Sequence, residues 1–125
     1  MVLLIAASTV TAVHHKSLTP PAKEGQVVVT YRGQCPAEAV DSAIAKIKET
    51  ISYERINSPI FYVSSPGVWA DGNIGAVDVH ESREAMDKAF AWQSEDSTWS
   101  TSYDAIVANC GITVNDFKVS IFEVR

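Results

Sequence analysis

The chain has 125 residues, of which 46% are hydrophobic and 20% charged, and its 10 Lys and Arg against 15 Asp and Glu give a formal net charge of -5. This length fits one domain that buries its own core, and an acidic chain without a basic cluster disfavours nucleic acid as a partner. The high apolar content is typical of a protein that covers further surface by dimerising.

The N-terminal quarter divides at a proline-rich stretch. The first 13 residues, MVLLIAASTVTAV, are too short and too rich in Thr and Ser to span a bilayer. No Lys or Arg precedes them and no small-residue cleavage site follows, so we expect them to belong to the folded protein, which we expect to be cytoplasmic and without a membrane segment. Adjacent prolines and a glycine in residues 17–25, SLTPPAKEG, break regular structure. We therefore expect residues 1–25 to be an N-terminal extension and linker, which adds an edge strand or reaches over a partner subunit.

The first half of the main domain, residues 26–125, reads as strand, helix, strand, strand. Residues 26–32, QVVVTYR, predict a strand buried on both sides. Pro36 suits a first helical turn, and an apolar stripe predicts an amphipathic helix of about four turns. Its members are Ala37, Val40, Ile44, Ile47 and Ile51. Strands are expected over residues 58–65 and 74–80, joined by a loop over 66–73 that contains Pro-Gly and Asp-Gly pairs.

The second half reads as a broken helix and a final strand. Ser82 is a good N-cap, so a helix is expected to begin at Arg83. The short hydroxyl side chains of residues 94–102, SEDSTWSTS, compete with the backbone and predict a loop or kink. Another apolar stripe runs to Cys110 and ends at Gly111, a residue typical of helix C-termini. Residues 116–125, DFKVSIFEVR, predict the last strand.

This order of elements predicts an α+β, ferredoxin-like βαββαβ fold with one four-stranded antiparallel sheet. Two helices cover only one face of such a sheet, whereas the strands carry apolar residues on both faces. In residues 74–80, for example, Val77 and Val79 oppose Ile74 and Ala76. Because a sheet that is apolar on both sides buries its second face, we expect two copies to pack sheet against sheet as a symmetric homodimer.

Two segments carry a resemblance to a known family: residues 77–90, VDVHESREAMDKAF, and residues 106–125, IVANCGITVNDFKVSIFEVR. Through them, residues 26–125 resemble the dimeric α+β barrel superfamily that includes the antibiotic-biosynthesis monooxygenases, and are most similar to the monooxygenases of the YdhR type. The resemblance implies an enzyme without metal or flavin, which binds an electron-rich aromatic or polyketide-type molecule and lets the substrate's own anion react with dioxygen. The same fold hosts cyclases, isomerases, haem-degrading enzymes and proteins without a known reaction.

Such a reaction needs an apolar cavity and a proton acceptor or hydrogen-bond donor at the substrate oxygen. His80 titrates near neutral pH and shares a strand face with Asp78, two residues earlier. We expect His80 to be the base or hydrogen-bond partner, with Asp78 favouring the protonated imidazole. The alternative is a histidine that ends a strand at the rim of the sheet and contacts water.

Aromatic residues are the candidates for substrate binding, because they offer flat apolar surface with a polar edge. We expect Tyr31, Tyr62 and Trp92 to line the pocket and Trp69 to act as a lid, and Trp99 to cap the cavity or the dimer edge. The alternative for each is ordinary packing in the core or at the dimer interface.

No cofactor is expected. The adjacent His14 and His15 point to opposite faces of an extended chain, so they form no metal site by themselves. Haem-binding relatives generally supply a histidine after the third strand, and residues 82–110 contain none. Cys35 and Cys110 belong to no CxxC motif; we expect two free thiols in a reducing compartment, with a disulfide as the sterically conceivable alternative.

The sequence thus predicts a homodimeric monooxygenase that acts without a cofactor on a small aromatic molecule. Two alternatives stay open: a cyclase or isomerase with the same pocket, and a non-catalytic dimer that binds a small ligand or takes part in a stress response.

Overall fold

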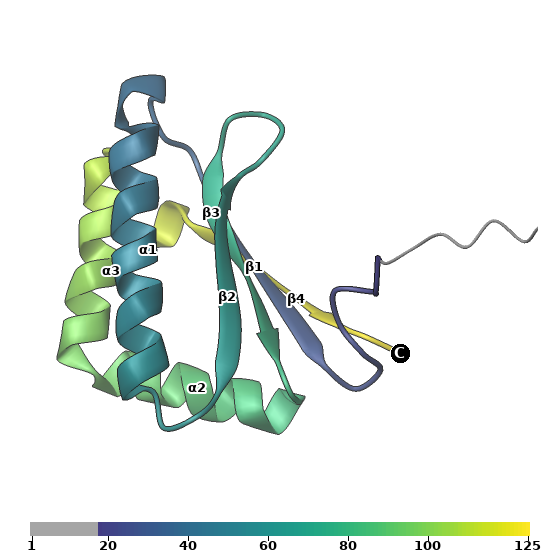
Figure 1. Ribbon diagram of the computed structural model, residues 1–125. Helices are drawn as coiled ribbons and strands as arrows, with labels where there is room; N and C mark the ends of the chain where they lie inside the picture. Colours follow the sequence, from purple (N-terminus) through teal and green to yellow (C-terminus); the bar gives the residue numbers. More distant parts are fainter. Residues whose placement is uncertain (1–17) are drawn as a thin grey trace, which may run out of the picture.

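A four-stranded antiparallel sheet forms the frame of the molecule, in the computed structural model, which describes residues 18–125. Its strand order is β2-β3-β1-β4, with bounds β1 (Val27–Gly33), β2 (Tyr62–Val68), β3 (Ile74–His80) and β4 (Lys118–Glu123). The helices α1 (Val40–Asn57), α2 (Arg83–Glu95) and α3 (Ser97–Asn109) lie on one side of the sheet, with α1 and α3 side by side and α2 crossing below them (Figure 1). Two short 3-10 helices, η1 (Ala37–Ala39) and η2 (Val114–Asp116), complete the order. The predicted α+β ferredoxin-like fold is confirmed.

Several local predictions are confirmed by hydrogen bonds. The Ser82 hydroxyl accepts from the amide of Ala85 at 3.0 Å and begins α2 as its N-cap. The predicted break falls at Asp96, which lies between α2 and α3. Its amide donates to the carbonyl of Trp92 as the C-cap of α2, and its carboxylate accepts from the amide of Trp99 at 2.8 Å as the N-cap of α3. Gly111 follows α3 with a φ of 72°, a backbone conformation that suits glycine.

The second strand lies further along the chain than predicted. Strand β2 begins at Tyr62 and continues through Pro66 to Val68, three residues into the stretch expected to be a loop. Proline is tolerated there because β2 is an edge strand that pairs only with β3. Its other edge has no neighbouring strand to which an amide hydrogen could donate. The connection to β3 is a tight turn in which the amide of Trp69 donates to Asn73 at 2.7 Å.

Helix α1 is longer than predicted, and its buried side includes residues that were not predicted. It begins at Val40 and reaches Asn57, six residues beyond the predicted stripe. Its buried side includes Ile47 and Ile51, as predicted, but Thr50 and Glu54 are buried with them. The apolar pattern fades after Ile51, and packing against α3 and the sheet decides the rest.

The open face of the sheet is apolar at one end and polar at the other. A row of paired residues crosses all four strands at the apolar end: Val63, Val79, Val28 and Phe122. The row at the opposite end, by contrast, contains Arg32 and Lys118. Phe122 is 65% exposed, and every residue of β4 is exposed in the single chain. The predicted second apolar face therefore covers part of the sheet and not all of it.

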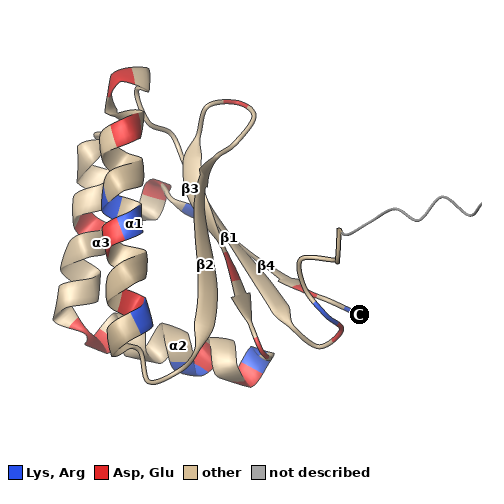
Figure 2. Ribbon diagram, viewed as in Figure 1, with Lys and Arg blue, Asp and Glu red and all other residues tan. Residues whose placement is uncertain are grey.

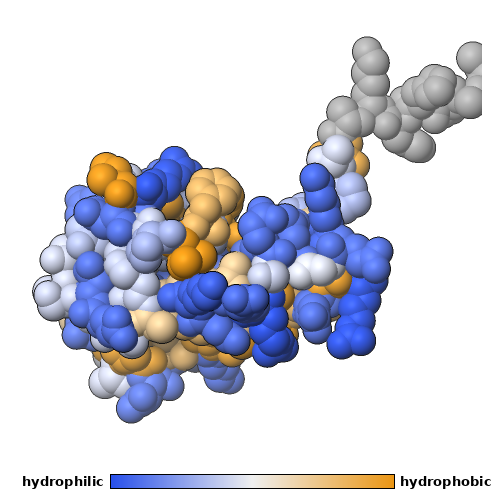
Figure 3. Space-filling model, turned by 90° about the horizontal axis from the view of Figure 1, so that it is seen from below, coloured by the Kyte–Doolittle hydropathy of each residue, from blue (hydrophilic) through white to orange (hydrophobic). Residues whose placement is uncertain are grey.

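Surface charge and hydrophobicity are mixed elsewhere. Acidic and basic residues are mixed along α1 and α2 in Figure 2, whereas the one charged residue of α3 is Asp104. Seen from below, hydrophobic residues occur in small groups between hydrophilic ones (Figure 3). Two strongly exposed apolar residues, Ile56 and Phe61, flank the connection between α1 and β2.

The cysteines form a disulfide, so the expectation of two free thiols is wrong. Cys35 and Cys110 are bonded, with their Cα atoms 4.6 Å apart. Cys35 follows the end of β1, and buried Cys110 follows the end of α3. The fold brings these two chain ends together. The bond links the entry to α1 with the exit from α3.

The expectations for residues 1–17, including a strand or partner contact and the pair His14 and His15, lie outside the described residues. Within residues 18–125, no helix is long and apolar enough to cross a membrane.

Candidate functional site

A cavity lies between the sheet and the helices α1 and α3. Its walls combine aromatic, aliphatic and acidic side chains; they are Tyr31, Ile47, Thr50, Ile51, Glu54, Ser64, Gly75, Ala76, Asp78, Trp99, Tyr103, Ile106 and Phe117. Its volume is about 40 Å³, which holds about three water molecules. No Lys, Arg or His is among the residues that line it.

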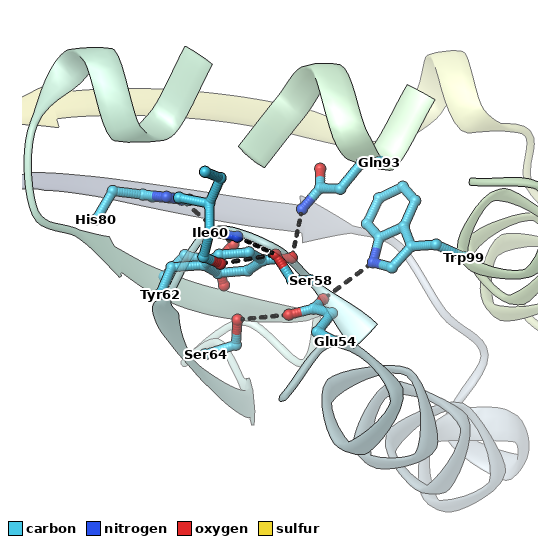
Figure 4. Close-up of polar contacts among 9 residues, drawn as sticks. Glu54, Ser58, Ile60, Tyr62, Ser64, His80, Gln93 and Trp99 are labelled. Carbon is cyan, nitrogen blue, oxygen red and sulfur yellow. Dashed lines mark hydrogen bonds and ion pairs between the residues drawn. The ribbon is translucent and has the colours of Figure 1, made fainter. Parts of the chain in front are cut away.

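Glu54 brings a carboxylate into this cavity from α1. It is 8% exposed, and each of its oxygens has a donor: Ser64 Oγ lies 3.2 Å from Oε2, and Trp99 Nε1 lies 3.1 Å from Oε1 (Figure 4). Burial raises the pKa of Glu54, and the hydrogen bonds from Trp99 and Ser64 oppose this increase. The residue thus joins α1, β2 and α3 at the cavity wall.

Asp78 supplies a second carboxyl group from β3. Its strand position places it opposite Val29 of β1 and Ser64 of β2, on the face that the helices cover, where it is 3% exposed. Burial and the negative charge of Glu54 raise the pKa of Asp78 to about 7, with the hydroxyls of Ser64 and Tyr31 acting in the opposite direction. A carboxyl group that titrates near neutral pH suits proton transfer.

His80 lies behind Asp78, at the end of β3. Its side chain is fully buried and stacks on Tyr62, with ring centroids 4.8 Å apart, while Phe90 presents its edge at 5.9 Å. Nε2 lies 3.8 Å from Oδ2 of Asp78, and neither ring nitrogen has a hydrogen-bond partner in the described part of the chain. His80 therefore does not contact water at the rim of the sheet.

The pKa of His80 shifts in the opposite direction to the one expected from its neighbour Asp78. Burial lowers the pKa of His80 and so favours the neutral imidazole. Asp78 cannot favour the imidazolium as expected, because burial also keeps its own carboxyl group largely protonated until the pH approaches 7. Because an interior without water disfavours charged groups, neutral Asp78 next to neutral His80 is the favoured protonation state.

The predicted aromatic residues occupy three different places. Tyr31 lines the cavity, and Tyr62 lies next to it, buried against His80 and accepting a hydrogen bond from Gln93 at 3.0 Å. Trp92 is half-buried and stacks on Tyr53 at a centroid distance of 6.3 Å, and it is not among the residues that line the cavity. Trp69 packs near the β2–β3 turn, where its indole donates to the carbonyl of Tyr31 at 3.1 Å.

The position of Trp69 depends on a glycine. Any side chain at Gly75 would collide with the carbonyl of Tyr31 and the indole nitrogen of Trp69. The guanidinium of Arg32 lies 5.1 Å from the centroid of the same indole ring and pairs with Asp71. These contacts fix Trp69 against the strands, and it is not among the residues that line the cavity.

Sequence reasoning did not assign Glu54, Ser64 or Tyr103 to the cavity. Trp99 was expected to cap either the cavity or the dimer edge. The structure places it in the cavity wall, where its ring stacks on that of Tyr103 with centroids 5.1 Å apart. Glu54 could have been found from its spacing, because it follows Ile47 and Ile51 at the helical interval on one face. Ser64 gave no comparable signal, since its importance depends on the pairing of β2 with β3.

Among residues 18–125, no group of three or more His, Cys, Asp or Glu side chains is arranged to hold a metal ion.

Comparison with solved structures places the fold among known proteins. A dimeric ferredoxin-like protein of unknown function from Jannaschia sp. CCS1 matches with a TM-score of 0.61 and 15% identity, over 80% of this chain and 100% of the other. SnoaB, a cofactor-independent oxygenase from Streptomyces nogalater, matches with a TM-score of 0.55 and 13% identity, over 81% and 94% of the two chains.

A third structure, described as an antibiotic biosynthesis monooxygenase, matches with a TM-score of 0.58 and 17% identity, over 79% of this chain and 98% of the other. This chain has the ferredoxin-like fold of these monooxygenases. At such identities the likeness concerns the fold, and the particular similarity to the YdhR type stays a prediction. No family model matches the sequence, and no curated protein does either.

Proposed function

We propose that the protein is a homodimeric, cofactor-independent monooxygenase that acts on a small aromatic or polyketide-type molecule. The observation that carries this proposal is the cavity itself, where the carboxyl group of Asp78, with a pKa of about 7, faces aromatic walls on a fold shared with a cofactor-independent oxygenase. A proton acceptor that titrates near neutral pH in a buried pocket suits the activation of an electron-rich ring.

In the proposed reaction, ionised Asp78 takes the proton of a substrate hydroxyl or an acidified carbon. The resulting substrate anion reduces dioxygen. One oxygen atom enters the substrate, and the other leaves as water with the two hydrogens that the substrate loses, so the substrate supplies all four electrons that reduce dioxygen. Asp78 is the base because it lines the cavity, whereas His80 is a positioning residue behind it, with Nε2 3.8 Å from the carboxyl oxygen. This assignment exchanges the roles predicted from the sequence.

The size of the cavity sets a condition on the substrate. A volume of about 40 Å³ accepts a polar group but not a whole aromatic ring. We propose that the ring enters when half-buried Trp99 moves away from Tyr103, because this stacked pair forms one wall. Tyr31 would then contact the substrate from β1, and Tyr62 would hold His80 in place from β2.

The dimer is proposed to form through the open face of the sheet. Support comes from the apolar row that ends at Phe122, and from the Jannaschia protein of the same fold, which is described as dimeric. In this arrangement the apolar ends of two sheets pack against each other, while Arg32 and Lys118 stay at the polar end.

Oxygen uptake tests the catalytic proposal. Purified protein is incubated with hydroquinone or 1-naphthol as probe, and dissolved oxygen and product are followed as the pH rises through 7. We expect uptake to increase with pH as Asp78 ionises, and to fall by about a hundredfold or more in Asp78→Asn. Asp87→Asn, which changes an exposed carboxylate on α2, is the matched control and keeps the rate. Equal rates in Asp78→Asn and the control would remove Asp78 from the reaction.

A non-catalytic, ligand-binding dimer is the second candidate, because a cavity of only about 40 Å³ is what a pocket largely filled by its own side chains leaves. A cyclase or isomerase would use the same base on an enolisable substrate. Product formation without oxygen uptake identifies the isomerase or cyclase, and binding without product identifies the ligand-binding protein.

A further inference from the structure

Several hydrogen-bond donors at the cavity are used within the protein. Ser64 Oγ and Trp99 Nε1 each donate to Glu54, at 3.2 and 3.1 Å (Figure 4). Thr50 Oγ1, also at the wall, donates to the main-chain oxygen of Lys46 at 3.0 Å. A ligand can use these three donors only by breaking a contact inside the protein.

The hydroxyl groups of Tyr31 and Tyr103 are different. Both residues line the cavity, from β1 and α3, and within residues 18–125 neither hydroxyl donates a hydrogen bond of normal geometry. The fully enclosed side-chain atoms without a partner in this part of the chain are the two ring nitrogens of His80. The two tyrosine hydroxyls are therefore not fully enclosed, and they are free to donate to a molecule in the cavity.

The carboxyl group of Asp78 lines the same cavity and acts on both tyrosines. Burial and the negative charge of Asp78 raise the pKa of Tyr103 to about 12. Burial, followed by the same charge, also raises the pKa of Tyr31. Both tyrosines therefore keep their hydroxyl hydrogens at a pH at which Asp78 is ionised, so that two donors and one acceptor face the cavity together.

We infer that these three groups bind one hydroxyl group of the substrate, which donates a hydrogen bond to Asp78 and accepts hydrogen bonds from Tyr31 and Tyr103. A hydroxyl has one hydrogen to donate and two lone pairs to accept, so it uses all three groups. The inference rests on the proposed function for the reaction, and it narrows the substrate class to phenols that lose their proton from oxygen. A volume of about 40 Å³ fits a hydroxyl group and the carbon that bears it, while the ring extends past half-buried Trp99.

In this arrangement the two tyrosines favour the formation of the substrate anion. When Asp78 takes the proton, the O–H bond of the phenol breaks, a new O–H bond forms at the carboxyl group, and the negative charge moves to the phenol oxygen. The ordinary pKa of a phenol is about 10, compared with a pKa of about 7 for Asp78, so this transfer alone is unfavourable by about a thousandfold. Hydrogen bonds from Tyr31 and Tyr103 strengthen as charge develops on the oxygen and offset part of this difference.

Other groups of similar size use the site less fully. The methyl group of toluene neither donates nor accepts a hydrogen bond. The amino group of aniline has one weakly accepting lone pair, so at least one tyrosine hydroxyl stays unpaired. A carboxylate has no hydrogen to donate to ionised Asp78 and brings a second negative charge. The site therefore selects a hydroxyl because it combines one donor with two acceptors.

Calorimetric titration under anaerobic conditions tests this inference with three probes of similar size: phenol, aniline and toluene. At pH 8, where most of Asp78 is ionised, we expect phenol to bind the unaltered full chain at least about tenfold more tightly than either of the others. The reason is its hydrogen bond to a charged group. Aniline or toluene binding as tightly as phenol overturns the inference. This comparison needs no variant, so it does not depend on whether a substitution folds.

Tyr31→Phe and Tyr103→Phe provide the second measurement. Each removes one hydroxyl and keeps the ring, so we expect each to weaken phenol binding by about three- to tenfold and to leave toluene binding unchanged. Ser52→Ala, which removes an exposed hydroxyl on α1, is the control and keeps the affinity for phenol. Unchanged phenol binding in both folded tyrosine variants overturns the inference. Equal weakening of phenol and toluene also overturns it, because it indicates altered packing.

The outcome is separable from that of the catalytic proposal, because phenol binding is measured without oxygen. Oxygen uptake by the unaltered chain, together with unchanged phenol binding in both tyrosine variants, supports the monooxygenase and refutes the hydroxyl site. Phenol binding that depends on the two tyrosines, without oxygen uptake, supports the hydroxyl site and refutes the monooxygenase.

Discussion

At the scale of single residues, burial controls the chemistry of Asp78. The residue lies on the covered face of β3 and is 3% exposed, so its ionised form loses most of the stabilisation that water provides. In the unfolded chain the same group has an ordinary pKa of 3.8, compared with about 7 in the folded chain. The difference makes Asp78 both a candidate base and a source of pH-dependent stability.

Because the folded state keeps a proton on Asp78 that the unfolded state releases, the free energy of unfolding falls as the pH rises from about 4 to 7 and levels off above that. Asn at this position stays neutral and removes the slope. Between pH 5 and pH 8 we expect Asp78→Asn to gain about 2 to 3 kcal/mol relative to the unaltered chain. Urea unfolding at both pH values measures this, and Asp87→Asn, the exposed control, should show no relative gain.

His80 combines full burial with two unpartnered nitrogens. Such groups cost about 1–3 kcal/mol each compared with satisfied ones, while the ring itself packs favourably on Tyr62 and Phe90. Because the unsatisfied nitrogens lower the free energy of unfolding, His80 fits a role at the cavity better than a role in stability.

Replacement of His80 separates these two contributions. We expect His80→Phe to keep the ring contacts, lose the unsatisfied nitrogens and leave the unfolding free energy unchanged or up to about 2 kcal/mol higher. His80→Ala should lower it by about 2–4 kcal/mol, since it leaves a cavity. Both variants should lose oxygen uptake, and a fully active His80→Phe would contradict a positioning role. Thermal and urea unfolding give the stabilities.

At the scale of elements, the site depends on where α1 and α3 are held against the sheet. Glu54 lies in the last turns of α1, and Trp99 lies in the first turn of α3, directly after the cap at Asp96. Tyr53 adds a hydrogen bond to the same Asp96 carboxylate at 3.0 Å. At the other end of the two helices, the Cys35–Cys110 disulfide holds the entry to α1 against the exit from α3.

The disulfide closes a loop with a sequence separation of 75, for which the chain-entropy model predicts a stabilisation of about 4 kcal/mol. We expect Cys35→Ser with Cys110→Ser to lower the unfolding free energy by up to this amount in urea. Reductant should destabilise the unaltered chain and leave the double variant unchanged, which serves as the control. A native mass that matches two free thiols would contradict the bond.

The same bond bears on the cellular location. Disulfides persist in oxidising compartments and are rare in the cytoplasm. The Cys35–Cys110 disulfide therefore disagrees with the predicted cytoplasmic location. The thiol content of protein isolated without reductant shows whether the bond forms in the cell.

At the scale of the whole molecule, a single chain leaves the apolar end of its sheet in water. Val63 is 45% and Phe122 65% exposed, and they belong to one continuous cross-strand row. Apolar area of this kind is typical of an interface. The mixed polarity of the rest of the open face indicates that a dimer would close mainly at one end.

Light scattering with size-exclusion chromatography tests the proposed dimer. We expect the unaltered protein to have the mass of two chains and Phe122→Lys to have the mass of one, because a buried unpaired charge disrupts an apolar contact. Ile56→Lys, at a position that is 82% exposed on α1, is the control and should stay dimeric. A single-chain mass for the unaltered protein would exclude the sheet-to-sheet arrangement.

The sequence alone determined the order and type of the elements, because local signals carry that information. The alternation in residues 74–80 predicted β3 to the residue, Ser82 marked the start of α2, and hydroxyl-rich residues located the break before α3. It also singled out Asp78 and His80, since period two places them on a common strand face, and Tyr31, since aromatic side chains suit a substrate pocket. The edge position of β2, which tolerates Pro66, could not be inferred locally.

Only the tertiary structure decided the contents and the electrostatics of the site. Glu54, Ser64 and Trp99 come from three elements and meet through packing between distant parts of the chain. Whether His80 is neutral and Asp78 protonated depends on burial, and whether Cys35 meets Cys110 depends on the distance between α1 and α3. Burial and distance are properties of the folded chain, so residue types and spacing alone do not determine them.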